Sequence, residues 1–193
     1  MPHPTKMSSD DTALLVIDVQ EKLMTKIPNA KELIHNIAFL IDGAKIAGVP
    51  VFATEQYPKG LGKTVAGLID RLPDRPEKLA FSSCVVPEIL EGIHKEGRQK
   101  VVLVGIETHV CVLQTALDLL AEGIRVYVAV DSVSSRYPID YEYALVRLDH
   151  TDAVLTTSET CVFEWIGGAD HPQFKQISQL VQNRMNVLEE DPK

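Results

Sequence analysis

The 193-residue chain lacks several features that would direct it to a membrane or to nucleic acid. Its longest apolar runs, such as Val101 to Ile106, are far shorter than the roughly 20 residues that cross a bilayer. No run of lysine or arginine stands out and the formal net charge is −8, so we expect neither nucleic acid nor a membrane as a partner. The polar residues from Met1 to Asp11 lack the apolar stretch of a signal peptide.

Cysteine and histidine are also too few or too scattered for a disulfide framework or a metal site. The three cysteines, Cys84, Cys111 and Cys161, have no framework spacing, which indicates free thiols in a reducing compartment. We therefore expect a cytoplasmic protein, although an organelle is not excluded. The six histidines show no metal-ligand spacing. The segment 60–64 lacks the glycine spacing of a phosphate-binding loop. From the histidine spacing we expect no metal, and from the missing loop we expect no cofactor.

What the chain does contain is an alternation of apolar strands and amphipathic helices. We expect strands at 13–18, 49–54, 101–105, 124–130 and 153–156, with a short strand or extended loop at 78–81. We expect helices at 30–47, 65–72, 87–95, 109–121, 139–148 and 174–185. Strands that are apolar on both faces indicate a parallel sheet covered by helices on both sides.

The alternation fits one domain with short polar ends. We expect a single domain at 12–185, with flexible tails at 1–11 and 186–193. The irregular stretch 55–86 is a candidate active-site wall or oligomer contact. In parallel sheets, ligands bind beyond the carboxyl ends of the strands, so polar residues at those ends are the first candidates for a functional site.

Cys111 is the most informative of these residues. It follows the strand 101–105, and with Thr108 as N-cap it falls in the first turn of the next helix. The helix dipole there favours a thiolate, which predicts a low thiol pKa, whereas the alternative is an inert buried thiol. Asp18 ends the first strand at the same edge, either as a catalytic carboxylate or as a cap. Lys78 precedes a short apolar run, and a lone lysine of this kind is usually solvated.

Three segments together resemble the signatures of the isochorismatase-like cysteine hydrolases, which include nicotinamidase, N-carbamoylsarcosine amidohydrolase and isochorismatase. They are Val16 to Gln20, Lys78 ahead of Phe81, and Gly105 to Val112. The resemblance implies a Rossmann-like, three-layer α/β/α fold with a mainly parallel six-stranded sheet in the order 3-2-1-4-5-6. It also implies a small-molecule substrate and a homo-oligomer.

The resemblance further implies a catalytic triad of Cys111, Asp18 and Lys78. Cys111 attacks an amide or related carbonyl, Asp18 serves as base, and Lys78 holds Asp18 and favours the thiolate. The backbone N–H groups of Glu107 and Cys111 form the oxyanion hole, beside a cis peptide bond between Ile106 and Glu107. The expected reaction is cleavage of a small amide or related C–N bond through a thioester.

The chain departs from nicotinamidases, which bind a metal through an Asp-x-His motif. No histidine lies between His35 and His94, and the segment 55–62 instead resembles the isochorismatase-domain-containing branch. The expected enzyme is therefore metal-independent. The expected pocket residues are Gln20, Glu55, Gln56, Tyr57, Phe81 and His109. The alternatives are a non-catalytic scaffold, a redox-sensing thiol protein and an isochorismatase-type vinyl-ether hydrolase.

Overall fold

The computed structural model describes the backbone of residues 3–190 and the side chains of residues 3–185. Within that range six strands form one sheet in the order β3-β2-β1-β4-β5-β6, and all neighbouring strands are parallel. The strands are β1 (Thr12–Ile17), β2 (Val51–Gln56), β3 (Glu77–Lys78), β4 (Lys100–Ile106), β5 (Arg125–Ser134) and β6 (Val154–Thr156). The predicted parallel sheet and its strand order are confirmed.

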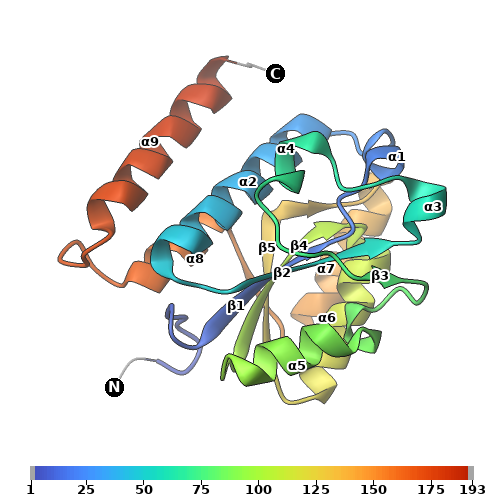
Figure 1. Cartoon of the computed structure of the whole chain (residues 1–193), viewed down its shortest axis with the longest axis horizontal. Coiled ribbons are helices and arrows are strands. Elements are labelled where there is room, and N and C mark those ends of the chain that lie inside the picture. Colours follow the sequence, from blue (N-terminus) through green and yellow to red (C-terminus); the bar gives the residue numbers. More distant parts are fainter. Residues whose placement is uncertain (1–2, 191–193) are drawn as a thin grey trace.

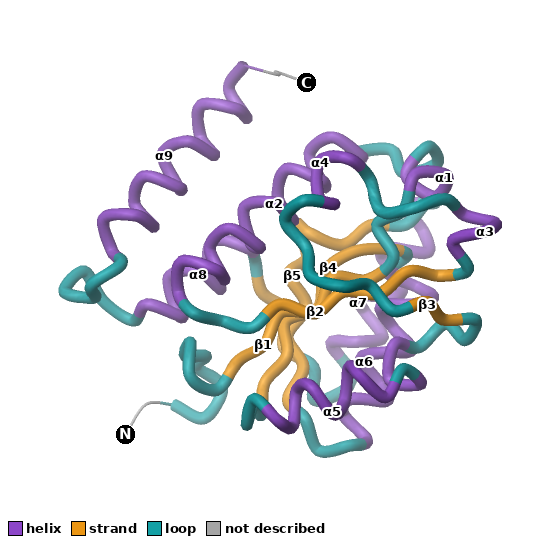
Figure 2. Tube along the Cα trace, in the orientation of Figure 1, coloured by secondary structure: helices purple, strands orange, loops and turns teal. Residues whose placement is uncertain are grey.

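Helices cover both faces of the sheet (Figures 1 and 2). One face packs against α2 (Ala30–Ala47) and α8 (Ser158–Ile166), with the short α4 (Ala66–Ile69) beside α2; α9 (Phe174–Glu190) lies outside this layer, against α2 and α8. The other face packs against α5 (Pro87–Lys95), α6 (Leu113–Ala121) and α7 (Pro138–Asp149). Two short helices, α1 (Glu21–Met24) and α3 (Pro58–Leu61), lie at the end of the molecule where β3 ends. The three-layer architecture is therefore as expected.

The central strands are level at their carboxyl ends, and this register sets up the site. Ile17 in β1 pairs with Thr54 in β2 and with Gly105 in β4. Gly105 has a φ of +113°, and a Cβ there would lie 2.1 Å from the carbonyl oxygen of Ile17. Only glycine allows this close approach of two strands. The polar residues that follow β1 and β4 consequently leave the sheet side by side.

Several predicted elements are longer or less regular than the sequence suggested. The helices 30–47 and 87–95 have the predicted bounds, but β5 continues to Ser134 after a register shift opposite β4. The predicted helix 109–121 begins as a π-helix at Thr108–Val112 and becomes α-helical only from Leu113. Helix α8 was not predicted. Its Trp165 is buried in the core.

The N-terminal segment is not the loose tail that its polar composition suggested. Met7 is buried, and its backbone N–H donates to Glu164 Oε2 at 2.8 Å. The Oη of Tyr127 donates to the carbonyl oxygen of Thr5, and Lys100 Nζ donates to that of Lys6 at 2.6 Å. At the other end, α9 continues to Glu190, so the predicted tail at 186–193 is helical over its first part, and residues 191–193 lie outside the described range.

Among the residues that the structure describes, none of the helices combines the length and the apolar character needed to cross a membrane.

Candidate active site

Three residues from distant parts of the sequence meet at the carboxyl edge of the sheet. Asp18 follows β1, Lys78 ends β3, and Cys111 lies in the π-helix after β4. Lys78 Nζ is 2.5 Å from Asp18 Oδ2, and both side chains are 0% exposed. The Cys111 thiol lies beside this pair: Asp18 and Lys78 both shift its pKa, and Cys111 in turn affects that of Asp18. The structure thus brings together the sulfur, the carboxylate and the ammonium group that the sequence singled out.

The backbone at Asp18 adopts a left-handed conformation that aims its side chain into the site. Its φ is +52°, a value that aspartate tolerates better than most residues. The turn is held by the backbone N–H of Asp18, which donates to the carbonyl of Thr54 at 3.2 Å, and by the N–H of Gln20, which donates to that of Asp18 at 2.8 Å. A residue that caps the next segment needs no such turn, so the capping alternative for Asp18 is not what the structure shows.

Lys78 is buried and has all its hydrogen-bonding capacity used. Besides Asp18, its Nζ donates to Gln56 Oε1 at 2.8 Å and to the carbonyl oxygen of Phe81 at 2.8 Å. A buried ammonium group is tolerated only when it is paired and hydrogen-bonded, as this one is. The solvated lysine that sequence statistics favour is therefore excluded, and Lys78 presents a fixed positive charge to the carboxylate and the thiol.

The environment of Cys111 differs from the one expected for an acidic thiol. Thr108 lies inside the π-helix instead of capping it, and the preceding Glu107 makes no side-chain cap. Cys111 is 6% exposed. Burial and the neighbouring Asp18 carboxylate raise the pKa of the Cys111 thiol to about 12, although Lys78 acts in the opposite direction. The predicted low pKa is wrong because loss of water and a nearby negative charge outweigh the helix dipole.

The pKa of the Asp18 carboxyl group is raised as well. Burial raises the pKa of Asp18 above its usual value, against the lowering effects of Lys78, Cys111 and Thr54. A base with a raised pKa accepts a proton from the thiol more readily than an ordinary carboxylate does. Both shifts favour the protonated forms, of the Cys111 thiol and of the Asp18 carboxyl group.

The peptide bond between Ile106 and Glu107 is cis, at the place that the resemblance implies. The side chain of Glu107 turns to Arg136: its Oε1 accepts from the backbone N–H of Arg136 at 3.0 Å, and its Oε2 lies 3.2 Å from Nη2. Arg136 is half exposed, so this ion pair lies partly at the surface.

Three of the expected pocket residues are engaged inside the protein. Gln20 Nε2 donates to the carbonyl oxygens of Gln56 and Gly62, and Glu55 Oε1 accepts from the N–H and hydroxyl of Thr64. Gln56 Oε1 accepts from Lys78 and its Nε2 donates to the carbonyl of Leu79. These side chains hold the loops around the triad, so we do not assign them to the pocket lining.

The other three expected pocket residues are more open. Tyr57 and Phe81 are each 50% exposed. The backbone N–H of Tyr57 donates to the carbonyl oxygen of Lys78, and Phe81 follows Lys78 by three residues. His109 places its Nδ1 2.9 Å from Ser135 Oγ and its Nε2 3.6 Å from Asp140 Oδ2, which ties it to β5 and α7. A direct Cys–His pair with Cys111 is not present in these contacts. A pocket lined by Tyr57, Phe81 and His109 stays a prediction.

The sequence reading missed a set of buried hydroxyls beside Asp18. Thr54 Oγ1 donates to Asp18 Oδ1 at 2.9 Å and lies 3.2 Å from Ser83 Oγ. The backbone N–H of Ser83 in turn donates to Thr115 Oγ1 at 2.9 Å. The available signal was the position of Thr54 at the carboxyl end of a predicted strand, the same position that singled out Asp18.

The residues of the site do not form a metal centre. Among the described residues, no group of three or more histidine, cysteine, aspartate or glutamate side chains is arranged to hold a metal ion. The positive charge that Asp18 requires is supplied by Lys78 instead.

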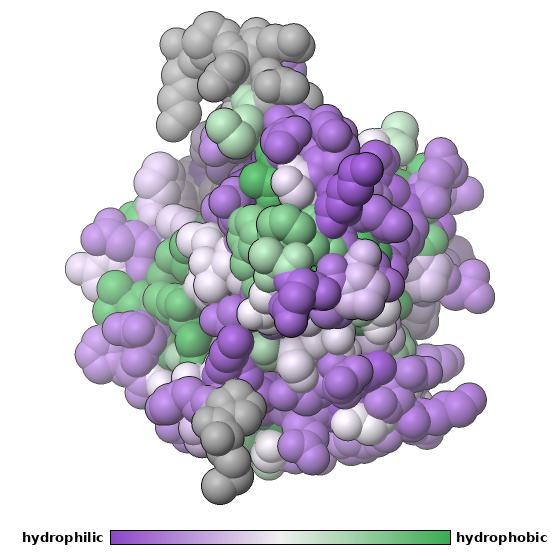
Figure 3. All heavy atoms as spheres, turned by 90° about the vertical axis from the view of Figure 1, so that its left-hand side faces the viewer, coloured by the Kyte–Doolittle hydropathy of each residue, from purple (hydrophilic) through white to green (hydrophobic). Residues whose placement is uncertain are grey.

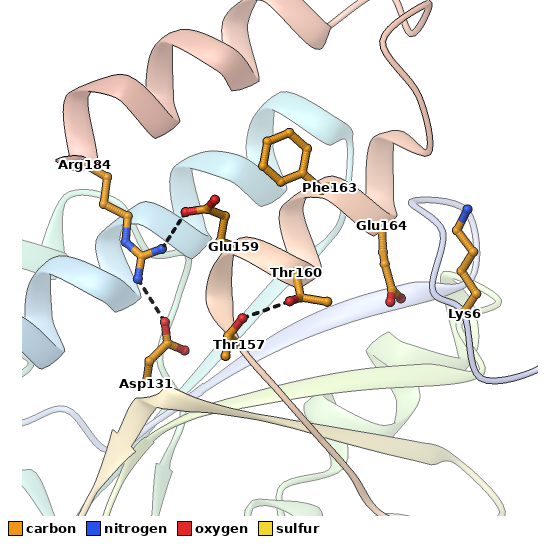
Figure 4. Close-up of a pocket in the computed structure, with 8 residues that line it drawn as sticks. All are labelled: Lys6, Asp131, Thr157, Glu159, Thr160, Phe163, Glu164 and Arg184. Atoms are coloured by element: carbon orange, nitrogen blue, oxygen red, sulfur yellow. Dashed lines mark hydrogen bonds and ion pairs between the residues drawn. The ribbon is translucent and has the colours of Figure 1, made fainter.

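A cavity of about 670 Å³ lies away from the triad (Figure 4). Arg184 of α9 lines it and pairs with Asp131 at 2.9 Å and with Glu159 at 3.4 Å. Its wall contains none of the three triad residues. The mixed and mutually paired charges indicate that these residues clamp α9 to β5 and α8, and we do not assign a ligand to the cavity.

The sheet order, the register and the site define the class of the protein, an α/β protein of the isochorismatase-like fold. Residues 12–160 match the family model described as "Isochorismatase domain". The chain therefore belongs to the isochorismatase family of hydrolase-like proteins.

Relatives and solved structures agree with this assignment. The chain is 39% identical over 175 residues to isochorismatase domain-containing protein 1 of Salmo salar; the match covers 88% of this chain and 60% of the relative. The chain thus spans less than two thirds of that relative's length. A structure titled MAR1 ribonuclease from Caenorhabditis elegans is 44% identical, with a TM-score of 0.86, covering 92% of this chain and 93% of that one. The YcaC gene product of Escherichia coli, titled an octameric hydrolase of unknown specificity, shares the fold at 22% identity and a TM-score of 0.85, with 98% of each chain covered.

Proposed function

We propose that the protein is a metal-independent cysteine hydrolase that cleaves a small amide or a related C–N bond through a thioester. The single observation that carries this proposal is the ion pair of Asp18 and Lys78, which is fully buried and lies close enough to Cys111 to shift the pKa of its thiol. A buried ion pair of this kind generally adds little net stability, so its place beside a thiol favours a catalytic role.

The first half of the reaction forms the thioester. Asp18 takes the proton of the Cys111 thiol as the sulfur attacks the carbonyl carbon, and the C=O electron pair moves onto oxygen. Lys78 stabilises the negative charge on the sulfur during this step. The backbone N–H groups of Glu107 and Cys111 hold the oxyanion. When the tetrahedral intermediate collapses, the C–N bond breaks and the leaving nitrogen receives the proton from Asp18.

The second half regenerates the enzyme. Asp18, again ionised, removes a proton from a water molecule, and the hydroxide attacks the thioester carbonyl. The C–S bond then breaks, the acid is released, and the Cys111 thiolate recovers its proton from Asp18. The raised pKa values of Cys111 and Asp18 suit this cycle, because the proton stays within the pair until a substrate is present.

Other functions fit the site less well. A scaffold has no physical need for a buried carboxylate and ammonium beside a thiol. A vinyl-ether hydrolase needs no nucleophilic sulfur, which leaves Cys111 without a role. The relative from Caenorhabditis elegans is titled a ribonuclease. RNA as substrate would bring phosphate charges to a chain of net charge −8, so we favour a small, uncharged acyl substrate.

The test is a screen of small amides and a structured RNA, with amine or nucleotide release measured for the wild type and for Cys111→Ala. We expect amine release by the wild type, loss of turnover in Cys111→Ala, and an acyl mass increase on the Cys111 peptide. Cys161→Ser removes another buried thiol, on α8, and should leave turnover intact. EDTA should also leave it intact. Turnover by Cys111→Ala, cleavage of RNA alone, or EDTA inactivation that zinc reverses would contradict the proposal.

We further infer that the chain works as a homo-oligomer in the cytoplasm. Large apolar side chains are exposed in two regions near the site. The first contains Tyr57, Leu79, Phe81 and Val85. The second contains Tyr137 and, within α7, Ile139, Tyr143 and Val146. Apolar side chains also gather on the face shown in Figure 3, and Phe163 of α8 and Met185 of α9 are among the exposed large apolar residues. Exposed apolar residues that cluster are typical of subunit contacts, and the fold relative YcaC is titled octameric. Three free cysteines favour a reducing compartment.

A further inference from the structure

Asp18 has two carboxylate oxygens, and the structure gives each of them a different kind of partner. Lys78 contacts Oδ2, whereas Oδ1 accepts a hydrogen bond from the hydroxyl of Thr54 at 2.9 Å. Thr54 is 2% exposed, so water does not replace this bond easily. The orientation of the carboxylate therefore depends on a neutral donor as well as on the lysine.

The direction of the bonds beyond Thr54 follows from counting protons. A hydroxyl has one proton to donate, and Thr54 gives its proton to Asp18. In the 3.2 Å contact of Thr54 Oγ1 with Ser83 Oγ, Ser83 must therefore be the donor. The two hydroxyls form a directed chain in which each bond points toward the carboxylate, and such chains strengthen one another in a dry environment.

The far end of this chain is attached to the helix that follows the nucleophile. Ser83 lies in the 3₁₀ turn Ser83–Val85, and its backbone N–H donates to Thr115 Oγ1 at 2.9 Å. Thr115 lies on α6, about one turn beyond Cys111, and like Ser83 it is fully buried. Asp18 is therefore connected to the helical segment that carries Cys111 through Thr54, Ser83 and Thr115.

We propose that the hydroxyls of Thr54 and Ser83, anchored by Thr115, form a hydroxyl relay. This relay positions the Asp18 carboxylate for proton transfer from Cys111. Thr54 and Ser83 are positioning residues that act through Asp18, and Thr115 fixes the turn that carries Ser83. The inference deepens the proposed function, since it rests on Asp18 as the base. It assigns a role to residues that are otherwise only buried polar groups in the core.

The test measures the rate of Cys111 alkylation by iodoacetamide as a function of pH, followed by peptide mass mapping, and needs no substrate. Below the pKa of Asp18 the rate should fall, because a protonated base cannot accept the thiol proton. Thr54→Val keeps the shape of the side chain and removes the donor to the ionised carboxylate. We expect the midpoint of the fall to move to higher pH by about one unit, which corresponds to about 1.4 kcal/mol.

Two further variants separate positioning from packing. Thr54→Ser restores the hydroxyl and should return the midpoint toward the wild-type value, while Ser83→Ala should move it upward by a smaller amount. The matched control is Ser132→Ala, which removes an equally buried hydroxyl that is paired with Ser158 Oγ at 2.6 Å and has no bond to the site. It should leave the midpoint unchanged even where it lowers the melting temperature.

The outcomes distinguish the relay from the proposed function. Coincident profiles for the wild type, Ser83→Ala and a folded Thr54→Val would overturn the relay; if Thr54→Val does not fold, an unmoved Ser83→Ala profile decides. Asp18→Asn should abolish the acid fall altogether. If Asp18→Asn keeps it, the base itself is misassigned and the proposed function fails. If Asp18→Asn loses it and the relay variants do not move it, only the relay fails.

Discussion

Strand β1 has an aspartate at each end, and each aspartate is paired with a lysine. Asp11 precedes the strand and lies 2.7 Å from Lys100 Nζ, while Asp18 follows it and lies 2.5 Å from Lys78 Nζ. The amino-edge pair keeps contact with water, since its side chains are 33% and 12% exposed, whereas both side chains of the carboxyl-edge pair are 0% exposed. The two pairs thus have the same chemistry in different surroundings.

The surroundings shift the pKa values of the two carboxyl groups in opposite directions. Partial burial of Asp11 opposes ionisation, but hydrogen bonds from Lys100, from the N–H of Ser8 and from the hydroxyl of Thr12 together lower the pKa of Asp11 below its usual value. At Asp18 burial dominates and raises the pKa despite Lys78. The amino-edge pair holds the N-terminal segment in place, whereas the carboxyl-edge pair has the raised pKa that the proposed base requires.

The largest difference between the two pairs should appear in catalysis and in the reactivity of Cys111. Asp18→Asn keeps the size of the side chain but removes the base, so turnover should fall by about 10²- to 10⁴-fold. Asp11→Asn changes the same residue type at the other end of the same strand and should leave turnover within about twofold. The measurement is the initial rate on the amide identified in the screen.

Circular dichroism of both variants serves as the control for folding. A folded Asp18→Asn with wild-type turnover would remove Asp18 from the mechanism. An Asp11→Asn variant as inactive as Asp18→Asn would mean that the two edges are coupled and that the contrast between them is not functional.

The contrast was only partly readable from the sequence. The end of an apolar strand singled out Asp18, and strand-to-helix placement singled out Cys111, because parallel strands bring their carboxyl ends together. Lys78 was identified through the family resemblance alone, since nothing local distinguishes a buried lysine from a solvated one. The anchoring of residues 3–11 was missed because it depends on side chains of β4 and β5 that donate hydrogen bonds to backbone carbonyl oxygens of that segment.

The pKa of Cys111 shows where sequence reasoning stops. Position in the first helical turn predicted a lowered value, and that inference would hold for a solvent-exposed thiol. Burial and the distance to a carboxylate are properties of the fold, and they reverse the sign. The set of hydroxyls was missed as a set, because Thr54, Ser83 and Thr115 lie in three separate segments and share no sequence pattern. Only Thr54 carried a signal of its own, its position at the end of a predicted strand.

The second prediction concerns stability. Lys78→Met leaves a buried carboxylate without its cation, so the free energy of unfolding should fall by about 3–5 kcal/mol. Lys100→Met removes the partner of a partly solvated carboxylate and should lower it by about 1 kcal/mol or less. Urea denaturation at pH 7 measures both values. Equal losses would show that the burial of the pair at the carboxyl edge has no energetic consequence.

The double variant Asp18→Asn/Lys78→Met sharpens this test. Removing both charges should recover part of the stability lost in Lys78→Met, because the uncompensated carboxylate is gone. A double variant that is less stable than Lys78→Met would indicate that Asp18 stabilises the fold through Thr54 more than Lys78 does.

The smallest expected effect is on the pH dependence of stability, where the two aspartates should act with opposite signs. Asp11 has a lowered pKa in the folded state, so its contribution is present above about pH 3.8 and is lost as the pH falls through the folded value. Asp18 has a raised pKa, so its contribution is fully present below about pH 3.8 and is lost as the pH rises through the folded value. Between about pH 3 and 6, Asp11→Asn should therefore flatten the loss of stability on acidification, and Asp18→Asn should steepen it, each by less than about 1 kcal/mol. Urea denaturation in steps of half a pH unit resolves the two slopes. Slopes that change in the same direction in both variants would contradict the opposite shifts, and with them the view that burial alone separates the two ends of β1.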